Sequence, residues 1–303
     1  MIARVIVTGA TGFIGRQTLA PLRELGFEVH VMGRRAPDDV AITFHSGNLF
    51  DSESAARIVG YVKPSYLLHL AWDTEPGRFW NSPLNLDWVG ASLALLRAFA
   101  EAGGKRAVMA GTCAEYRWGD DRPLDETRSE LAPSTLYGVS KDALRRVVFA
   151  YAETASVSVA WGRIFFLYGP EEKTGRLVSD AIRSLGSGQP FATTDGRQLR
   201  DFMHVEDVAR AFAALLASDV SGAVNIATGQ SVAVRAVLEA IAGETGAHGL
   251  LRLGERPRAA DDPAVIVAAS DRLRYEVGFT PRYAIDEGVA QTVRWWREQR
   301  CKF

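Results

Sequence analysis

Residues 5–15 read Val5-Ile6-Val7-Thr8-Gly9-Ala10-Thr11-Gly12-Phe13-Ile14-Gly15, and this stretch decides the fold. An apolar, β-branched strand runs directly into a glycine-rich turn, and a helix-like segment follows at once. Glycines let the backbone turn tightly and approach a pyrophosphate, whose charge is stabilised at the N-terminal end of the helix dipole. The pattern predicts a dinucleotide-binding turn formed by Gly9, Thr11, Gly12, Phe13, Ile14 and Gly15.

The alternation of strand and helix continues through the first half of the chain. Strands are predicted at 3–8, 28–32, 66–70, 106–110 and 157–164, and helices at about 13–25, 52–61, 84–102 and 136–154. Such alternation is typical of βαβ units around a parallel sheet. The apolar strand at 66–70 suits a sheet that helices cover on both faces. We predict a Rossmann-type, doubly wound α/β domain over residues 1–170.

The second half of the chain differs from the first in composition and in the length of its predicted elements. After Tyr168-Gly169-Pro170, segments rich in Gly, Pro, Arg and Asp separate short helices predicted near 176–186, 205–217, 231–244 and 285–299. We predict that residues 171–303 form a smaller α/β region that is partly interleaved with the first and binds the substrate.

Bulk properties exclude several classes of protein. The 303 residues are 47% hydrophobic and 23% charged with a formal net charge of -1, which argues against disorder and against a global basic field for nucleic acid. The two cysteines, Cys113 and Cys301, are far apart and lack metal-ligand spacing, so we expect neither a disulfide nor a metal site. No signal-peptide pattern or membrane-length apolar run is present. We expect a cytoplasmic enzyme without a membrane partner.

The end of the second predicted strand bears on the choice of cofactor. NAD-selective dinucleotide folds usually carry an acid there, bonded to the ribose 2′-hydroxyl. This chain has Gly33, Arg34 and Arg35 instead. A guanidinium can pair with a 2′-phosphate, although a solvated basic turn is the alternative. We predict NADP(H) as the preferred cofactor, with NAD(H) as the alternative.

The sequence TGATGFIG at 8–15 resembles the TGxxGxxG motif of short-chain dehydrogenases/reductases, and in particular their extended branch, the NAD-dependent epimerase/dehydratase family that modifies nucleotide sugars. Asn48, Leu49 and Asp51 resemble the family's adenine-contacting segment, with Asn in place of the first acid. His69-Leu70-Ala71 resembles the strand end beneath the cofactor, and Asn85 the structural asparagine of the next helix. The resemblance implies cofactor contacts at Asn48, Leu49, Leu70, Ala71 and Trp72.

Tyr137 and Lys141 form a Y-x-x-x-K motif whose spacing places both side chains on one helix face. A phenol needs a nearby cation to transfer protons at neutral pH, and the lysine supplies one. Alone, this spacing also suits a surface pair. The resemblance implies that Tyr137 exchanges the proton and that Lys141 holds the nicotinamide ribose, so both also contact the cofactor. In the segment 111–118, it implies that Thr112 polarises the reacting oxygen.

Two later segments resemble the branch's substrate-binding motifs. Residues 163–170 resemble R-x-x-N-x-Y-G-P, with Phe166 in place of the asparagine, and residues 200–208 resemble R-D-F/Y-x-H-V-x-D-V. The resemblance implies a nucleotide-diphosphate sugar as substrate, with Arg200 and either Arg256 or Arg258 on its diphosphate.

The residues after Thr112 reduce the number of candidate reactions. A 4,6-dehydratase of this branch carries an acid–base pair there, but this chain has Cys113 and Ala114, with Glu115 one place too late. Cys113 is either a substrate-side acid–base group or a buried thiol. We predict an NADPH-dependent 4-ketoreductase of a nucleotide 4-keto-6-deoxyhexose, with a 4-epimerase that retains NAD as the alternative. A non-catalytic NADP(H) sensor is disfavoured by the Tyr/Lys pair.

The resemblance also implies a homodimer that forms through the helices at 84–102 and 136–154.

Overall fold

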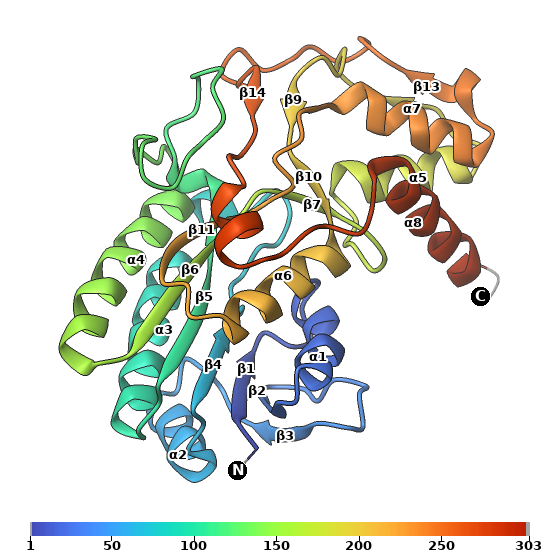
Figure 1. The fold of residues 1–303 in the computed structure, drawn as a ribbon. Helices are drawn as coiled ribbons and strands as arrows, with labels where there is room; N and C mark the ends of the chain where they lie inside the picture. The colour runs from blue at the N-terminus through green and yellow to red at the C-terminus, as the bar shows by residue number, and fades with distance from the viewer. Residues whose placement is uncertain (1, 301–303) are drawn as a thin grey trace.

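The strand predicted by the opening motif, β1 (Arg4–Thr8), lies near the centre of a seven-stranded sheet in the computed structural model, which describes residues 2–300 (Figure 1). The sheet order is β11-β6-β5-β4-β1-β2-β3, and every neighbouring pair is parallel. The other strands are β2 (Glu28–Gly33), β3 (Thr43–Ser46), β4 (Tyr66–His69), β5 (Arg106–Thr112), β6 (Ser158–Ile164) and β11 (Gly222–Ile226).

Helices cover both faces of this sheet. One face carries α1 (Gly15–Glu24) and α6 (Val205–Ala217), and the other carries α2 (Ser52–Val62), α3 (Leu84–Glu101) and α4 (Leu136–Ala155). The alternation of side chains along β1 explains the two layers, because Val5 and Val7 pack in the first and Ile6 in the second. All three side chains are fully buried. The architecture confirms the predicted Rossmann-type α/β fold class.

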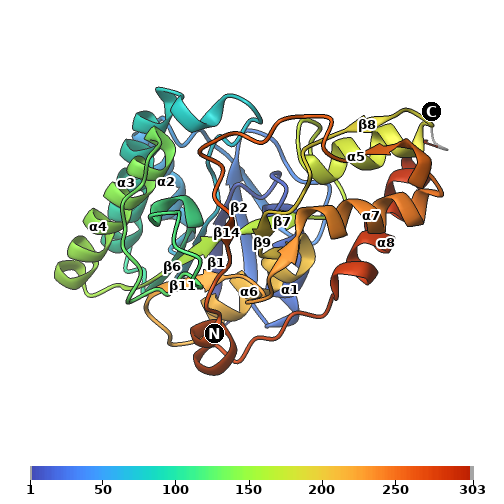
Figure 2. The same ribbon diagram turned by 90° about the horizontal axis from the view of Figure 1, so that it is seen from above.

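A smaller α/β region packs beside the sheet and has its own apolar core. Its helices α5 (Leu177–Gly186), α7 (Val234–Thr245) and α8 (Ile285–Arg300) lie on the side of the molecule opposite α2, α3 and α4, as Figure 2 shows. Short strands complete it: β7 (Phe166–Tyr168), β8 (Phe191–Ala192), β9 (Leu199–Arg200), β10 (Phe202–His204), β12 (Val232–Ala233), β13 (Leu251–Arg252) and β14 (Val265–Ile266). Single turns form η1 (Phe79–Asn81), η2 (Cys113–Glu115), η3 (His248–Leu250) and η4 (Arg272–Glu276).

Two strands of the large sheet were not predicted. β3 reads Thr-Phe-His-Ser and is only half-buried at the sheet edge, so it lacks an apolar run. β11 lies after residue 170, yet it pairs with β6 at the opposite edge. β11 and α6 therefore belong to the second half of the sequence but pack with the seven-stranded sheet. The division at residue 170 therefore stays a prediction, with residues 205–226 as the interleaved part.

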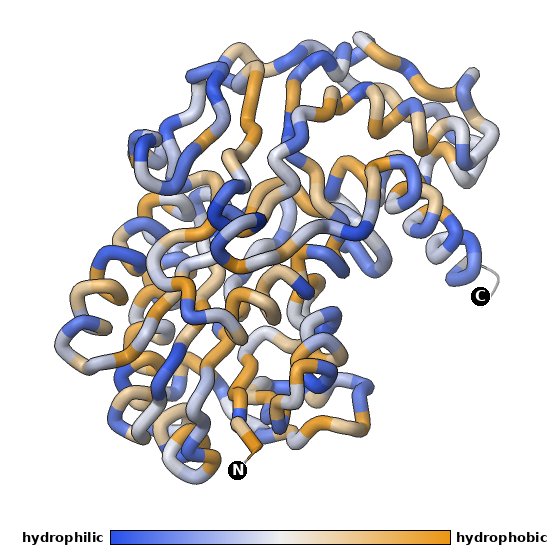
Figure 3. The backbone as a smooth tube through the Cα atoms, viewed as in Figure 1, coloured by the Kyte–Doolittle hydropathy of each residue, from blue (hydrophilic) through white to orange (hydrophobic). Residues whose placement is uncertain are grey.

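Apolar and polar positions alternate along the helices that border the sheet (Figure 3). Within residues 2–300, no helix is long and apolar enough to cross a membrane. Cys113 is a buried free thiol, and Cys301 lies outside the described residues.

Candidate functional site

The glycine-rich turn lies where the sheet reverses its winding, between β1 and β4. Ligands of doubly wound sheets bind at the carboxyl ends of the strands at this switch point. Gly9 has φ +76°, and a Cβ there would come within 2.7 Å of the Ala71 backbone nitrogen. A Cβ on Gly15 would overlap the Gly9 carbonyl oxygen, so α1 can pack this closely only without a side chain. The turn has the form of a cradle that fits a pyrophosphate.

A pocket of about 1170 Å³ opens at this edge of the sheet and brings most of the predicted site residues together. Its lining includes Gly9, Thr11, Gly12, Phe13, Ile14, Gly15, Arg34, Arg35, Asn48, Leu49, Leu70, Ala71, Trp72, Thr112, Cys113, Tyr137, Lys141, Phe166 and Arg200. Of the predicted substrate residues, Arg256 and Arg258 are not among the described residues that line it.

The cofactor end of the pocket is bordered by β2 and the segment after β3. Gly33 ends β2, and Arg34 and Arg35 follow as exposed residues on the pocket wall. Asn48 accepts a hydrogen bond from the Phe50 amide through its side chain. Asp51, by contrast, caps α2 by accepting from the Ser54 amide and is not part of the pocket lining. Of the two polar residues in the segment predicted to contact adenine, the structure thus places Asn48 in the pocket lining but not Asp51.

Tyr137 and Lys141 lie one turn apart near the start of α4, and both are buried. Thr135 caps this helix by accepting from the Gly138 amide. A side chain on Gly138 would overlap the Ala114 carbonyl, so its absence lets α4 pack against the turn that follows Thr112. The Lys141 ammonium donates to the Ala110 carbonyl at 2.8 Å. The helix therefore presents the phenol and the ammonium beside the end of β5.

The protonation of these two side chains is set mainly by burial. Burial raises the pKa of Tyr137, against a smaller lowering from a hydrogen bond with Thr112. Burial also lowers the pKa of Lys141 to about 7, which the Glu115 carboxylate opposes. His69 bridges Thr8 and Ser92, and its pKa is lowered to about 3 by burial and then by the Lys141 charge, so the ring is neutral. Tyr137 is thus a protonated phenol at neutral pH next to a lysine that titrates there.

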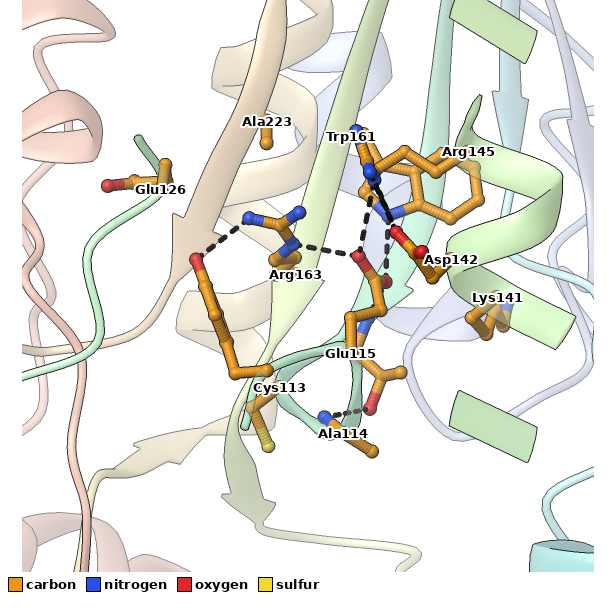
Figure 4. A network of polar contacts seen from close by, with 12 residues as sticks. Cys113, Ala114, Glu115, Glu126, Lys141, Asp142, Arg145, Trp161, Arg163 and Ala223 are labelled. Atoms are coloured by element: carbon orange, nitrogen blue, oxygen red, sulfur yellow. Dashed lines mark hydrogen bonds and ion pairs between the residues drawn. The ribbon is translucent and has the colours of Figure 1, made fainter. Parts of the chain in front are cut away.

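Thr112 is held by a buried carboxylate that sequence reasoning did not assign. Glu115 is fully buried and accepts from the Thr112 amide at 2.8 Å, the Trp161 indole at 2.8 Å and Arg163 at 2.7 Å (Figure 4). The Arg163 side chain is only 1% exposed. Glu115 therefore points into the fold and fixes the turn that carries the Thr112 hydroxyl.

Cys113 lines the pocket as a buried thiol. Burial raises its pKa to about 12, so the thiol is protonated at neutral pH. Sequence reasoning left open whether Cys113 is an acid–base group or a packed thiol. Its burial and raised pKa favour the packed thiol.

Several aromatic rings around Tyr137 were missed by sequence reasoning. Phe79 and Trp80 meet the Tyr137 ring edge-on with centroids at 5.0 and 5.8 Å, and Trp118 lies 6.4 Å from Trp80. All three line the pocket. In the sequence, the adjacent aromatic residues Phe79 and Trp80 in an otherwise polar loop could have indicated this cluster. These rings make the reacting end of the pocket largely apolar.

The predicted substrate end is organised around Arg200. Its guanidinium lies 5.4 Å from the Phe166 ring and pairs with Asp262 at 2.5 Å. Arg258 pairs with the same carboxylate at 3.1 Å, so it lies behind Asp262. The Arg256 amide instead bonds the Thr193 carbonyl. Asp262, which also lines the pocket, was missed because an acid was not expected among the diphosphate ligands.

Comparisons with known proteins agree with this geometry. The model of the NAD dependent epimerase/dehydratase family matches residues 5–227. The UDP-glucose 4-epimerase of Rhizobium meliloti (strain 1021) is 28% identical, over 98% of this chain and 97% of its own. The structure of MoeE5 in complex with UDP-glucuronic acid and NAD is 32% identical and covers 98% of this chain and 100% of that chain, with a TM-score of 0.83. The Thermus thermophilus UDP-glucose 4-epimerase complex with NAD is 26% identical over 97% and 99%, with a TM-score of 0.86.

Proposed function

This chain belongs to the NAD dependent epimerase/dehydratase family, and from that premise we propose that it is a 4-epimerase of a UDP-hexose that retains NAD. At the coarser level, it is an NAD(P)-dependent enzyme that modifies nucleotide sugars. The similarity to UDP-glucose 4-epimerases extends over nearly the full length of both chains, and this supports the alternative over the ketoreductase predicted first. The NAD bound in related structures likewise favours NAD over NADP(H).

In the proposed reaction, Tyr137 first loses its own proton, and the tyrosinate then takes the proton of the C4 hydroxyl while Thr112 donates a hydrogen bond to the same oxygen. A bound nicotinamide supplies the hydride acceptor and donor. Inversion would require the 4-ketose to turn over in the pocket, so that the hydride returns to its opposite face while the Tyr137 phenol gives the proton back to the C4 oxygen. The Lys141 ammonium would stabilise the tyrosinate that forms before Tyr137 takes this proton and again after the proton is returned. Arg200 would hold the diphosphate, which leaves the sugar free to rotate about it.

One observation carries this proposal: Tyr137 lies beside Thr112, and the three residues that follow Thr112 supply no acid–base pair to the pocket. Ala114 has no titratable group, the Cys113 thiol is protonated, and Glu115 points into the core. Elimination of water would need a second positioned acid and base. The site therefore suits hydride and proton exchange at one sugar carbon rather than 4,6-dehydration.

The proposal is tested with purified protein and no added nicotinamide. UDP-glucose and UDP-glucuronic acid are incubated separately, and inversion at C4 is followed by proton NMR of the sugar. The released cofactor is identified by mass spectrometry after denaturation. We expect inversion of at least one sugar without net nicotinamide oxidation or reduction. Failure to invert either sugar, with protein shown to carry NAD, would refute the epimerase proposal.

A second candidate function is the NADPH-dependent 4-ketoreductase of a nucleotide 4-keto-6-deoxyhexose. The observation that favours it is the end of β2, where Arg34 and Arg35 line the pocket without an acid for the ribose 2′-hydroxyl. Consumption of stoichiometric NADPH that depends on the 4-keto sugar would support this reaction.

The Arg34→Ala/Arg35→Ala double variant tests this cofactor argument directly. If these guanidiniums hold a 2′-phosphate, NADPH binding is expected to weaken about tenfold to a hundredfold, because charge-assisted hydrogen bonds contribute about 1.5–3 kcal/mol. NADH binding should change little. Fluorescence titration of both cofactors gives the ratio, and Arg128→Ala, with a side chain 86% exposed, is the matched control. Equal weakening for both cofactors would contradict 2′-phosphate selection.

A homodimer through α3 and α4 stays a prediction. The exposed apolar side chains on these helices, Leu84, Leu86, Val139 and Val147, support it.

A further inference from the structure

The ammonium of Lys141 lies against the face of an indole ring. Its nitrogen is 3.7 Å from the centroid of the Trp72 ring, and it donates only to the Ala110 carbonyl among the described hydrogen bonds. A cation at this distance from an indole face is attracted by the ring's negative quadrupole, most strongly where water is excluded. Lys141 is 4% exposed, so the contact is desolvated.

The position of the Trp72 ring is fixed by two residues of α3. Its indole N–H donates to the Asn85 side-chain oxygen at 2.9 Å, and Asn85 itself donates to the Phe79 and Ser82 carbonyls. The ring also stacks on Trp88 with centroids 5.9 Å apart. Trp72 is therefore held in place by α3, since Asn85 binds its indole N–H and Trp88 stacks on its ring.

The other groups that face Lys141 give little support to its charge. From β4, His69 is neutral, and from β6, the Trp161 ring is distant at 6.0 Å. On α4 itself, Tyr137 is a protonated phenol. From η2, Glu115 is negative, but it is already paired with Arg163 at 2.7 Å and lies 3.9 Å from Arg145.

Burial, only partly opposed by the Glu115 charge, lowers the pKa of Lys141 to about 7 and would leave this lysine half-deprotonated near neutrality. The proposed reaction needs the ammonium, because only the charged form stabilises a tyrosinate at Tyr137. A group that favours the charged lysine without neutralising it is thus required, and an uncharged aromatic face meets that condition.

We propose that Trp72 is a positioning residue that keeps the Lys141 ammonium charged and directed at the reacting end of the pocket by facing it with its indole ring. The consequence for turnover rests on the proposed function, whereas the effect on the lysine does not. Replacing the ring by an aliphatic side chain should let Lys141 lose its proton at lower pH. The alkaline limb of the pH–rate profile should move down with it.

The direct measurement is an NMR titration of the protein labelled with ¹³C-lysine, which is tractable because the chain has five lysines. The Lys141 signal is assigned by its loss in Lys141→Arg. We expect Trp72→Leu to lower the Lys141 pKa by about one pH unit, the size of a desolvated cation–π contact. Trp72→Phe keeps a ring face and also lacks the indole N–H, so it should retain most of the wild-type value. Equal lowering in both variants would assign the effect to the lost Asn85 bond and overturn the proposal.

Kinetics give the second readout. In Trp72→Leu, the ratio of kcat at pH 8 to kcat at pH 6 should fall about fivefold against wild type, the change that a one-unit fall in the Lys141 pKa produces, and Trp72→Phe should restore it. If Trp72→Leu does not fold, 5-fluorotryptophan labelling weakens the ring face without changing its shape. It should then lower the Lys141 pKa in wild type but not in Trp72→Phe. A Lys141 pKa that is the same in Trp72→Leu as in wild type would refute the role of Trp72. If the wild-type protein shows no C4 turnover, only the proposed function is refuted, because the titration still tests the role of Trp72.

Discussion

Turnover of the Tyr137→Phe variant is expected to fall by about 10³-fold, with nicotinamide binding retained. The variant loses only the phenolic oxygen, and a positioned acid–base group contributes about 10²–10⁴-fold to a rate. The ring itself would stay packed among Phe79 and Trp80, which contact its edge. The measurement is kcat for C4 inversion, with cofactor stoichiometry determined on the same preparation.

The matched control is Tyr275→Phe, which removes a hydroxyl from a tyrosine that is 71% exposed and outside the pocket lining. Its turnover should equal that of wild type. Residual activity of Tyr137→Phe above a tenth of wild type would show that another group transfers the proton. A parallel loss of bound cofactor would instead indicate that the site had collapsed.

Most of the fold could be predicted from the sequence because its signals are local. The apolar strands and the amphipathic helices of the first half have the predicted types, with ends that differ by a few residues at most. β11 could not be placed, since its pairing with β6 joins segments about sixty residues apart and nothing within Gly222–Ile226 specifies the partner. β3 was not predicted for a different reason. It lies at the edge of the sheet, where Thr43 and Ser46 are exposed and Phe44 and His45 are only half-buried, so its sequence contains no apolar run.

The sequence indicated residues that share one pocket where a motif has fixed spacing, and it gave no signal for contacts that depend on tertiary packing. Tyr137, Lys141 and the glycine turn share one pocket. Asp262 was missed because its pairing with Arg200 spans 62 residues. Glu115 was recognised only as displaced from a catalytic position. Its actual partner, Arg163, lies on another strand, and no spacing rule connects the two.

The largest stability effect is expected from Glu115→Gln. Glutamine keeps an acceptor for the Thr112 amide but leaves Arg163 as an uncompensated charge in the core, where the carboxylate is fully buried and the guanidinium side chain is 1% exposed. Removing one partner of a buried pair costs about 3–5 kcal/mol. For a chain of this size, that corresponds to a fall in Tm of roughly 10 °C. Calorimetry at neutral pH measures it.

Glu130→Gln is the control, because Glu130 also pairs with an arginine at 2.7 Å but both side chains are more than 60% exposed. Exposed pairs contribute about 0–1 kcal/mol, so its Tm should change by no more than a degree or two. The double variant Glu115→Gln/Arg163→Met removes the unpaired charge and should recover part of the lost stability. Strictly additive effects of Glu115→Gln and Arg163→Met would mean that the two side chains are not coupled, and the turn holding Thr112 would then owe its order to other contacts.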